Sequence, residues 1–158
     1  MEKVIAVDFD GTCVTHMYPA VGEDIGAEIV LSKLVEKGYK LILYTVRDGE
    51  QALDALKWFE KYEIPIWAVN ENPTQKNWTA SPKVYADFYI DDAAIGTALT
   101  RKDRNNLDER PFVDWYTTVM IMVDRGILDA EEAKKIFAEL EKKYPELYDP
   151  EVIFNLEF

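Results

Sequence analysis

Four short runs of apolar residues divide the first hundred positions of the chain. The runs at residues 4–7 and 40–45 are rich in aliphatic side chains, which indicates strands buried on both faces of a sheet. The run at residues 66–69 follows Pro65, which suits a strand at the edge of a sheet. Residues 83–90 alternate apolar and polar side chains and predict a fourth strand.

Longer stretches with helical spacing lie between these strands. Residues 24–37 carry aliphatic side chains three to four positions apart, and Gly38 supplies a helix end. A second helix opens at Asp48, which fits a capping box with Gln51. Strands that alternate with helices predict an α/β fold, with right-handed crossovers that place the helices on the faces of a parallel sheet. We expect a Rossmann-like sheet with the strand order 3-2-1-4.

The chain changes character after residue 100. Residues 101–110 are charged and predict a connection, and no further strand is expected. Pro111 fits the first position of a helix that Gly126 ends, and Asp129 with Glu132 fits the cap of a second helix. The apolar stripes of this helix pair include Phe112, Trp115, Tyr116, Val119, Met122, Ala133, Ile136, Phe137 and Leu140. Such stripes must be buried, either on the sheet layer or on a second copy of the chain.

The 158 residues suit one domain, with a core at residues 1–100 and a helical extension at residues 101–158. The 18 basic and 30 acidic residues give a net charge of −12, which argues against nucleic acid as a partner. The single cysteine excludes an intrachain disulfide, and no apolar run approaches the length of a membrane span. We therefore expect a soluble, cytoplasmic protein that has no membrane partner.

Aspartates follow two of the predicted strands. Asp8 and Asp10 come after the first strand, and Asp91 and Asp92 come after the fourth. Since ligands of open α/β sheets bind at the carboxyl ends of the strands, we expect these four carboxylates to converge. Each one alone could cap a following helix, but two pairs together repel one another unless a cation neutralises them. The pattern favours Mg²⁺, which prefers oxygen ligands and shares its coordination with phosphate.

The segment D-F-D-G-T at residues 8–12, after a hydrophobic strand, resembles the first motif of the haloacid dehalogenase-like hydrolases. Later segments resemble the other motifs of this family in order. Thr45 at the end of the second strand matches the second motif, Lys83 the third, and the acidic pair at residues 91–92 the fourth. The resemblance covers residues 1–100 and implies a small phosphatase without a cap domain, because neither insertion point has room for one.

The resemblance also assigns roles to these residues. Asp8 would be the nucleophile that forms an aspartyl-phosphate, and Asp10 the group that protonates the leaving oxygen and then activates water. Thr45 would hydrogen-bond the phosphoryl group, and Lys83 would neutralise its charge. The implied Mg²⁺ ion would be held by the Asp8 carboxylate, the Asp10 carbonyl, Asp91 and Asp92. Substrate contacts are expected from Gly11, Thr12, Val46 and Arg47.

Several side chains near these motifs allow more than one interpretation. Arg47 could clamp a second anionic group of the substrate, or it could be a surface arginine paired with Asp48 or Glu50. His16 could contact the leaving group, but it fits a solvated side chain or a local hydrogen-bond partner better than a catalyst. Cys13 fits a small buried hydrophobe better than a reactive thiol. Trp78, in the polar loop at residues 70–82, could stack on a base or simply pin the loop.

An open site favours a small phosphomonoester as substrate, such as a sugar phosphate or a nucleotide, and a homo-oligomer whose neighbours complete the pocket. A receiver domain also forms an aspartyl-phosphate, but it carries its acidic pair after the first strand and its phosphoacceptor on a later one. The order of the motifs here is the reverse. A binding or scaffold protein that only keeps the fold, and a phosphotransferase acting on a macromolecule, are the alternatives left open.

Overall fold

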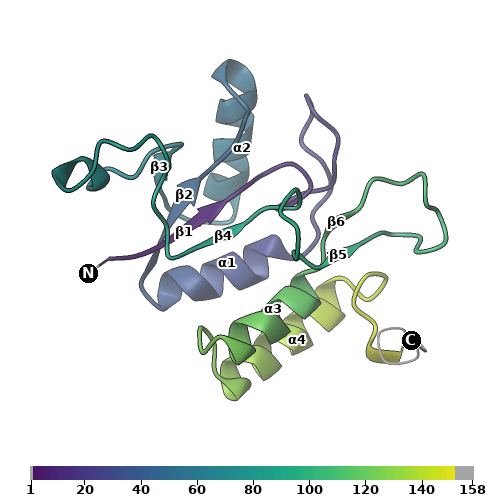
Figure 1. Ribbon diagram of the computed structural model, residues 1–158. Helices are drawn as coiled ribbons and strands as arrows, with labels where there is room; N and C mark the ends of the chain where they lie inside the picture. Colours follow the sequence, from purple (N-terminus) through teal and green to yellow (C-terminus); the bar gives the residue numbers. More distant parts are fainter. Residues whose placement is uncertain (1, 152–158) are drawn as a thin grey trace.

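The computed structural model describes residues 2–151, and Figure 1 shows its arrangement of helices and strands. A four-stranded parallel sheet has the order β3-β2-β1-β4, which confirms the predicted fold class and strand order. The strands are β1 (Lys3–Val7), β2 (Tyr39–Leu43), β3 (Ile66–Val69) and β4 (Phe88–Ile90). Val7 lies opposite Leu43 on one side and Ile90 on the other, so β1, β2 and β4 end level with one another.

The fourth strand is shorter than the sequence predicts. Residues 83–87 form a loop in place of the first part of the strand, and the side chain of Gln75 explains why. Its amide oxygen accepts the N–H of Tyr85 at 2.8 Å, and its amide nitrogen donates to the carbonyl of Lys83 at 2.6 Å. A side chain therefore binds main-chain groups that a strand would offer to its neighbour.

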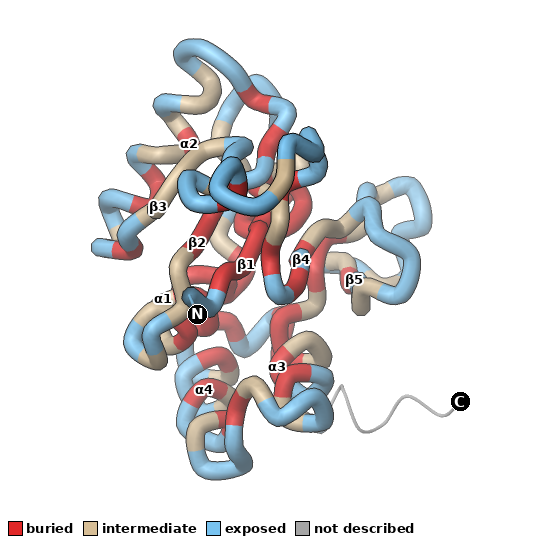
Figure 2. Tube along the Cα trace, turned by 60° about the vertical axis from the view of Figure 1, so that its left-hand side comes forward, coloured by how far each residue is buried: buried red, intermediate tan, exposed pale blue. Residues whose placement is uncertain are grey.

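The helices α1 (Ala27–Glu36) and α2 (Gly49–Lys61) cover one face of the sheet. The crossovers from β1 to β2 and from β2 to β3 step in the same direction, so their right-handedness places both helices on that face. Side chains of β1 and β2, such as Ile5 and Leu41, join both helices in the main hydrophobic core. Figure 2 shows these two strands as largely buried.

Loop residues cover the opposite face of the sheet. The connection from β3 to β4 steps the other way and therefore crosses this face, where it contains only the short 3-10 helix η1 (Gln75–Asn77). Val4, Ala6 and Ile42 pack here against Val84 and Ala86 in a second, smaller apolar cluster. Helices thus flank one face of the sheet, while the other face has a thin cover.

The predicted C-terminal helices are present as α3 (Trp115–Asp124) and α4 (Ala130–Lys143), which lie side by side against α1 (Figure 1). Within residues 2–151, no helix combines the length and the apolar character that a membrane span requires.

The helices α1 and α4 approach each other closely at Gly26, just before α1. A Cβ atom on Gly26 would lie 2.5 Å from a methyl group of Leu140, so glycine permits this approach. Trp115, Tyr116 and Met122 are buried in the main core. The apolar stripes are therefore covered within the chain itself.

A short antiparallel ribbon precedes α3 and corrects the prediction for this region. It consists of β5 (Leu99–Thr100) and β6 (Phe112–Val113), where no strand was expected. Pro111 does not begin a helix, because α3 starts only at Trp115 and Asp114 caps it by accepting the N–H of Thr117 at 3.1 Å. Phe112 and Val113 are aromatic and β-branched residues that are fully buried, which favours a strand.

Candidate active site

The carboxyl ends of β1, β2 and β4 meet at one edge of the sheet and bring three predicted motifs together. Asp8 follows β1, and its N–H binds the last carbonyl of β4 at 3.0 Å. Tyr44 follows β2, and its N–H binds the last carbonyl of β1 at 2.8 Å. These bonds continue the sheet by one residue on either side of β1. Thr45 and Asp91, the next residues of their segments, therefore emerge on either side of Asp8.

Three carboxylates form a cluster at this edge. Asp8, Asp91 and Asp92 each offer one oxygen, and these oxygens all lie within 4.8 Å of one another. Burial, a hydrogen bond with Asp92 and the charges of the neighbouring carboxylates raise the pKa of Asp8 to about 8. A bound cation would relieve this crowding, and a set of oxygen ligands suits Mg²⁺. The residues present therefore fit the cofactor that the sequence indicates.

Asp10 does not join this cluster through its carboxylate. Its two oxygens accept hydrogen bonds from Nε and Nη2 of Arg47, both at 2.7 Å. The predicted convergence of four carboxylates is therefore observed for three of them. The role expected for Asp10 in metal binding uses its main-chain carbonyl, and the ion pair with Arg47 does not involve that group.

Two side chains hold the cluster in place. The hydroxyl of Thr12 donates to Asp8 Oδ2 at 2.7 Å and accepts the N–H of Asp92 at 3.1 Å. Nε2 of His16 lies 3.0 Å from Asp92 Oδ2, so His16 is a local hydrogen-bond partner. Thr12 is fully buried, and its hydroxyl orients the aspartates. The resemblance implied a contact with substrate for this residue, and the structure shows the hydroxyl bound within the protein instead.

Gly11 makes this arrangement possible. Its φ of +78° lies in the left-handed region, and a Cβ atom here would lie 2.0 Å from Nε2 of His16 and 2.8 Å from Asp92 Oδ2. Only glycine allows the imidazole ring to approach Asp92 at this position. The N–H of Gly11 is already bound to the carbonyl of Val14 at 2.8 Å, so it is not free for the expected substrate contact.

Thr45 is fixed by Asn70, a residue that no motif of the sequence predicts. Asn70 follows β3, and its side chain accepts the N–H of Thr45 and donates to its carbonyl, both at 2.8 Å. The Thr45 hydroxyl accepts the N–H of Arg47 at 3.1 Å, which leaves its own proton for a phosphoryl oxygen. A polar residue directly after a predicted strand is the signal that could have identified Asn70.

Lys83 lies outside the carboxylate cluster in this structure. Its side chain is exposed, and Nζ lies 5.8 Å from the centre of the Tyr89 ring. None of the ion pairs among residues 2–151 joins Lys83 to an aspartate. Tyr89 pairs with Ala6 of β1, and Asp8 lies two positions beyond Ala6 on the same side of the strand. The lysine is thus on the face of the sheet toward which Asp8 points.

Of the four residues expected to contact substrate, only Val46 is exposed. It is 98% exposed directly after Thr45, at the edge where the aspartates lie. Arg47 is only 2% exposed. It is therefore neither a clamp for a second anionic group of the substrate nor an arginine on the surface. Cys13 is buried beneath Asp8, with Sγ 3.3 Å from the Asp8 carbonyl, which confirms the interpretation of this residue as a small buried group.

The C-terminal region supports the loop that carries the first motif. The indole Nε1 of Trp115 donates to the carbonyl of Thr12 at 2.8 Å, and the N–H of Val113 donates to the carbonyl of Gly11 at 2.9 Å. The sequence pattern predicts Trp115 only as part of an apolar stripe and indicates no function for this region. No local pattern in the sequence indicates a bond across such a distance along the chain.

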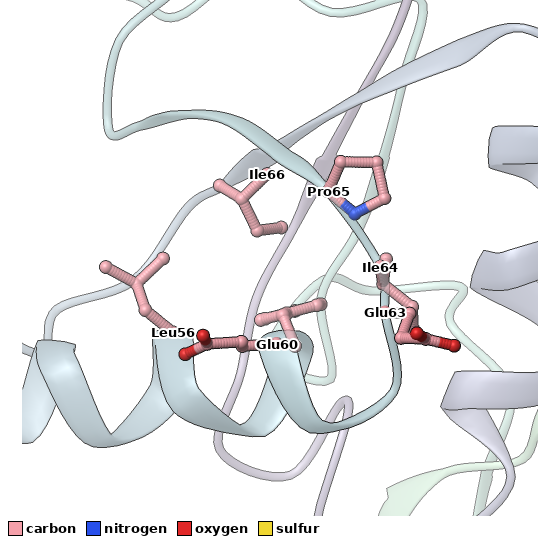
Figure 3. Close-up of a pocket in the computed structure, with 7 residues that line it drawn as sticks. Leu56, Glu60, Glu63, Ile64, Pro65 and Ile66 are labelled. Carbon is pink, nitrogen blue, oxygen red and sulfur yellow. The ribbon is translucent and has the colours of Figure 1, made fainter.

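Two of the cavities that residues 2–151 form lie at the edge of the sheet away from the carboxylates. One, of about 730 Å³, is formed by α2 and the segment that leads into β3, with Glu60, Ile64 and Ile66 in its wall (Figure 3). The other, of about 530 Å³, lies on the thinly covered face, between Trp78 and the start of β1. Both lie at the amino ends of strands, which is the edge of the sheet opposite Asp8. Trp78 is therefore not placed to contact a substrate at the carboxylate cluster.

Comparison with known proteins supports the fold. No family model and no curated protein matches the chain. Among solved structures, the chain is similar to a conserved protein from Bacteroides thetaiotaomicron, with a TM-score of 0.56 and 29% identity. The match covers 84% of this chain and 97% of that chain. That protein is described only as conserved, so the function of this chain has to be inferred from the geometry of its site.

Proposed function

We propose that the protein is a Mg²⁺-dependent phosphomonoester hydrolase of the haloacid dehalogenase-like superfamily. The observation that carries this proposal is the arrangement of the aspartates. Asp8 forms a cluster of oxygen ligands with two other aspartates, while the carboxylate of Asp10 is bound by Arg47 outside this cluster. A cluster of this kind suits a phosphoryl group bound together with a metal ion, and a separate carboxylate beside it suits proton transfer.

In the proposed reaction, Asp8 is the nucleophile. One of its oxygens forms a bond to phosphorus while the bond from phosphorus to the leaving oxygen breaks, which gives an aspartyl-phosphate and a free alcohol. Asp10 donates the proton that the leaving oxygen takes up. In the second step, Asp10 accepts a proton from the water molecule that attacks phosphorus. The bond between phosphorus and Asp8 then breaks, which releases phosphate and restores the carboxylate.

The surrounding groups stabilise charge on the phosphoryl oxygens. Mg²⁺ would supply positive charge there when held by Asp8, the Asp10 carbonyl, Asp91 and Asp92. Thr45 donates its hydroxyl proton to a non-bridging oxygen, because its other hydrogen-bonding groups are already occupied. Lys83 neutralises charge by swinging from the Tyr89 ring toward Asp8, along the face of the sheet that both share.

The substrate in this proposal is a small phosphomonoester, such as a sugar phosphate or a nucleotide. At the edge that carries the aspartates, β2 is joined to α2 by residues 44–48 alone, and the exposed Val46 lies there directly beside Thr45. The net charge of −12 disfavours nucleic acid as substrate. We also propose that a second copy of the chain completes the pocket, and that the enzyme works in the cytoplasm, where its single buried cysteine stays reduced.

Phosphate release tests this proposal directly. The assay uses sugar phosphates, nucleoside monophosphates and p-nitrophenyl phosphate, each with Mg²⁺ and with EDTA. We expect turnover that requires Mg²⁺ and falls at least about 1,000-fold in Asp8→Asn, because the nucleophile is lost. Asp108→Asn, an exposed aspartate in the charged connection, serves as the matched control and should keep full activity. A folded wild-type protein that releases phosphate from none of these esters would point to the scaffold alternative.

A further inference from the structure

Arg47 is a charged side chain that the fold buries completely. Its side chain has no exposed surface, and all five N–H groups of the guanidinium donate hydrogen bonds within the protein. Two of these bonds go to the carboxylate of Asp10, and the other three go to the carbonyl groups of Pro19, Ala20 and Gln51. No N–H group remains for a substrate, so the role of Arg47 lies within the protein.

Two aromatic rings also lie against the guanidinium. Its central carbon lies 5.1 Å from the centre of the Phe9 ring and 5.2 Å from the centre of the Tyr18 ring. Phe9 is fully buried, whereas Tyr18 belongs to the exposed part, residues 17–20, of the flap at residues 13–21. Five hydrogen bonds and two ring contacts leave the guanidinium one orientation. A carboxylate bound through both oxygens to such a rigid fork is fixed as well.

We propose that Arg47 is a positioning residue that orients Asp10 for proton transfer. The inference rests on the proposed function, since it takes Asp10 as the acid and base of the reaction. Rotation of the Asp10 carboxylate would break two charge-assisted hydrogen bonds, each of them 2.7 Å long. The bonds to Pro19 and Ala20 tie the flap to the same guanidinium, so one buried side chain aligns both Asp10 and the loop above it.

The dependence of kcat/KM on the leaving group distinguishes this positioning role from a merely structural one. An alkoxide leaving group needs the proton of Asp10, whereas p-nitrophenolate leaves readily without one. The ratio kcat/KM reports only the steps up to the first irreversible product release, which here is the breaking of the ester bond. A misplaced Asp10 therefore lowers kcat/KM for an alkyl phosphate much more than for p-nitrophenyl phosphate.

The experiment compares 2-phenylethyl phosphate with p-nitrophenyl phosphate at saturating Mg²⁺, using wild type, Arg47→Lys and Arg47→Met. Both variants should lose about 100-fold in kcat/KM for the alkyl ester and less than about threefold for the nitrophenyl ester. Arg47→Lys keeps a positive charge without the fork, and it provides a second variant if Arg47→Met does not fold. Arg110→Met, at an exposed arginine, is the matched control and should change neither value.

A double-variant cycle completes the test. If Arg47 acts through Asp10, then Arg47→Lys should cause no further loss for the alkyl ester when it is made in Asp10→Asn. Equal losses for both esters, or a further loss in the Asp10→Asn background, would overturn the proposed positioning role. A wild-type protein that hydrolyses neither ester nor any other phosphomonoester would overturn the proposed function itself and the positioning role with it.

Discussion

Asp8 is the carboxylate of the site whose pKa departs from its ordinary value, because burial and the neighbouring carboxylates raise it from 3.8 to about 8. Without metal, the folded protein keeps a proton on Asp8 that the unfolded chain releases above about pH 4. A group of this kind stabilises the folded state below its unfolded pKa, and this contribution is lost as the pH rises toward its folded pKa. The metal-free protein should therefore lose stability between about pH 4 and pH 8.

Asp8→Asn removes the ionisable group and so tests this argument. In EDTA at pH 8, we expect the variant to be more stable than wild type by roughly 2–5 kcal/mol in urea denaturation. At pH 4.5 the difference should shrink to about 1 kcal/mol. Mg²⁺ should stabilise the wild type at pH 8 and have little effect on the variant. Equal stability of the two proteins at both pH values would show that burial does not oppose the charge on Asp8.

The sequence predicts the aspartates of the site well because their positions depend only on where strands end. Parallel strands in register bring Asp8 and Asp91 to the same edge without any further information. The direction of the Arg47 side chain cannot be predicted in this way, since its long stem can turn toward substrate, solvent or the protein interior. Asn70 lies in a bend after β3, and the path of a bend leaves no periodic pattern in the sequence. Arg47 and Asn70 therefore needed the structure, whereas a local hydrogen bond was one of the roles expected of His16.

At the scale of elements, the two predicted capping boxes differ. At the start of α4, the Asp129 side chain accepts the N–H of Glu132 at 2.8 Å, and the Glu132 side chain accepts the N–H of Asp129 at 2.9 Å. Asp48, at the start of α2, makes no capping bond with its side chain. We expect Asp129→Ala to lower the free energy of unfolding by about 1 kcal/mol and Asp48→Ala by less than about 0.5 kcal/mol. Urea denaturation of both variants measures this, and losses of equal size would contradict it.

The elements with clear periodicity were predicted, and those without it were not. The order β3-β2-β1-β4 and the helices α1 to α4 follow from apolar runs and stripes that extend over several residues. The ribbon of β5 and β6 has two residues in each strand, too few to show alternation. Phe112 lies three positions before Trp115, so its place in a strand could not be distinguished from a place in the helical stripe.

At the scale of the whole molecule, the C-terminal helices share one hydrophobic core with the sheet. Trp115, Val119 and Ile136 belong to the same apolar cluster as Ile5 and Val7 of β1. A fragment of residues 1–111 would expose the side of α1 that α3 and α4 cover. We expect this fragment to lack the cooperative urea transition of the full chain, as measured by circular dichroism. A cooperative transition in the fragment would show that residues 1–111 form an independent domain.

The hydrogen bond from Trp115 to the Thr12 carbonyl joins residues 103 positions apart. During synthesis, the segment with Asp8 and Asp10 leaves the ribosome long before Trp115 does. N-terminal parts of a chain can begin to fold first, but this loop receives its support only after residues 112–115 have emerged. If the proposed function holds, a growing chain already contains these acidic residues before the metal site has formed. Metal loading is then a late event that follows translation of most of the chain.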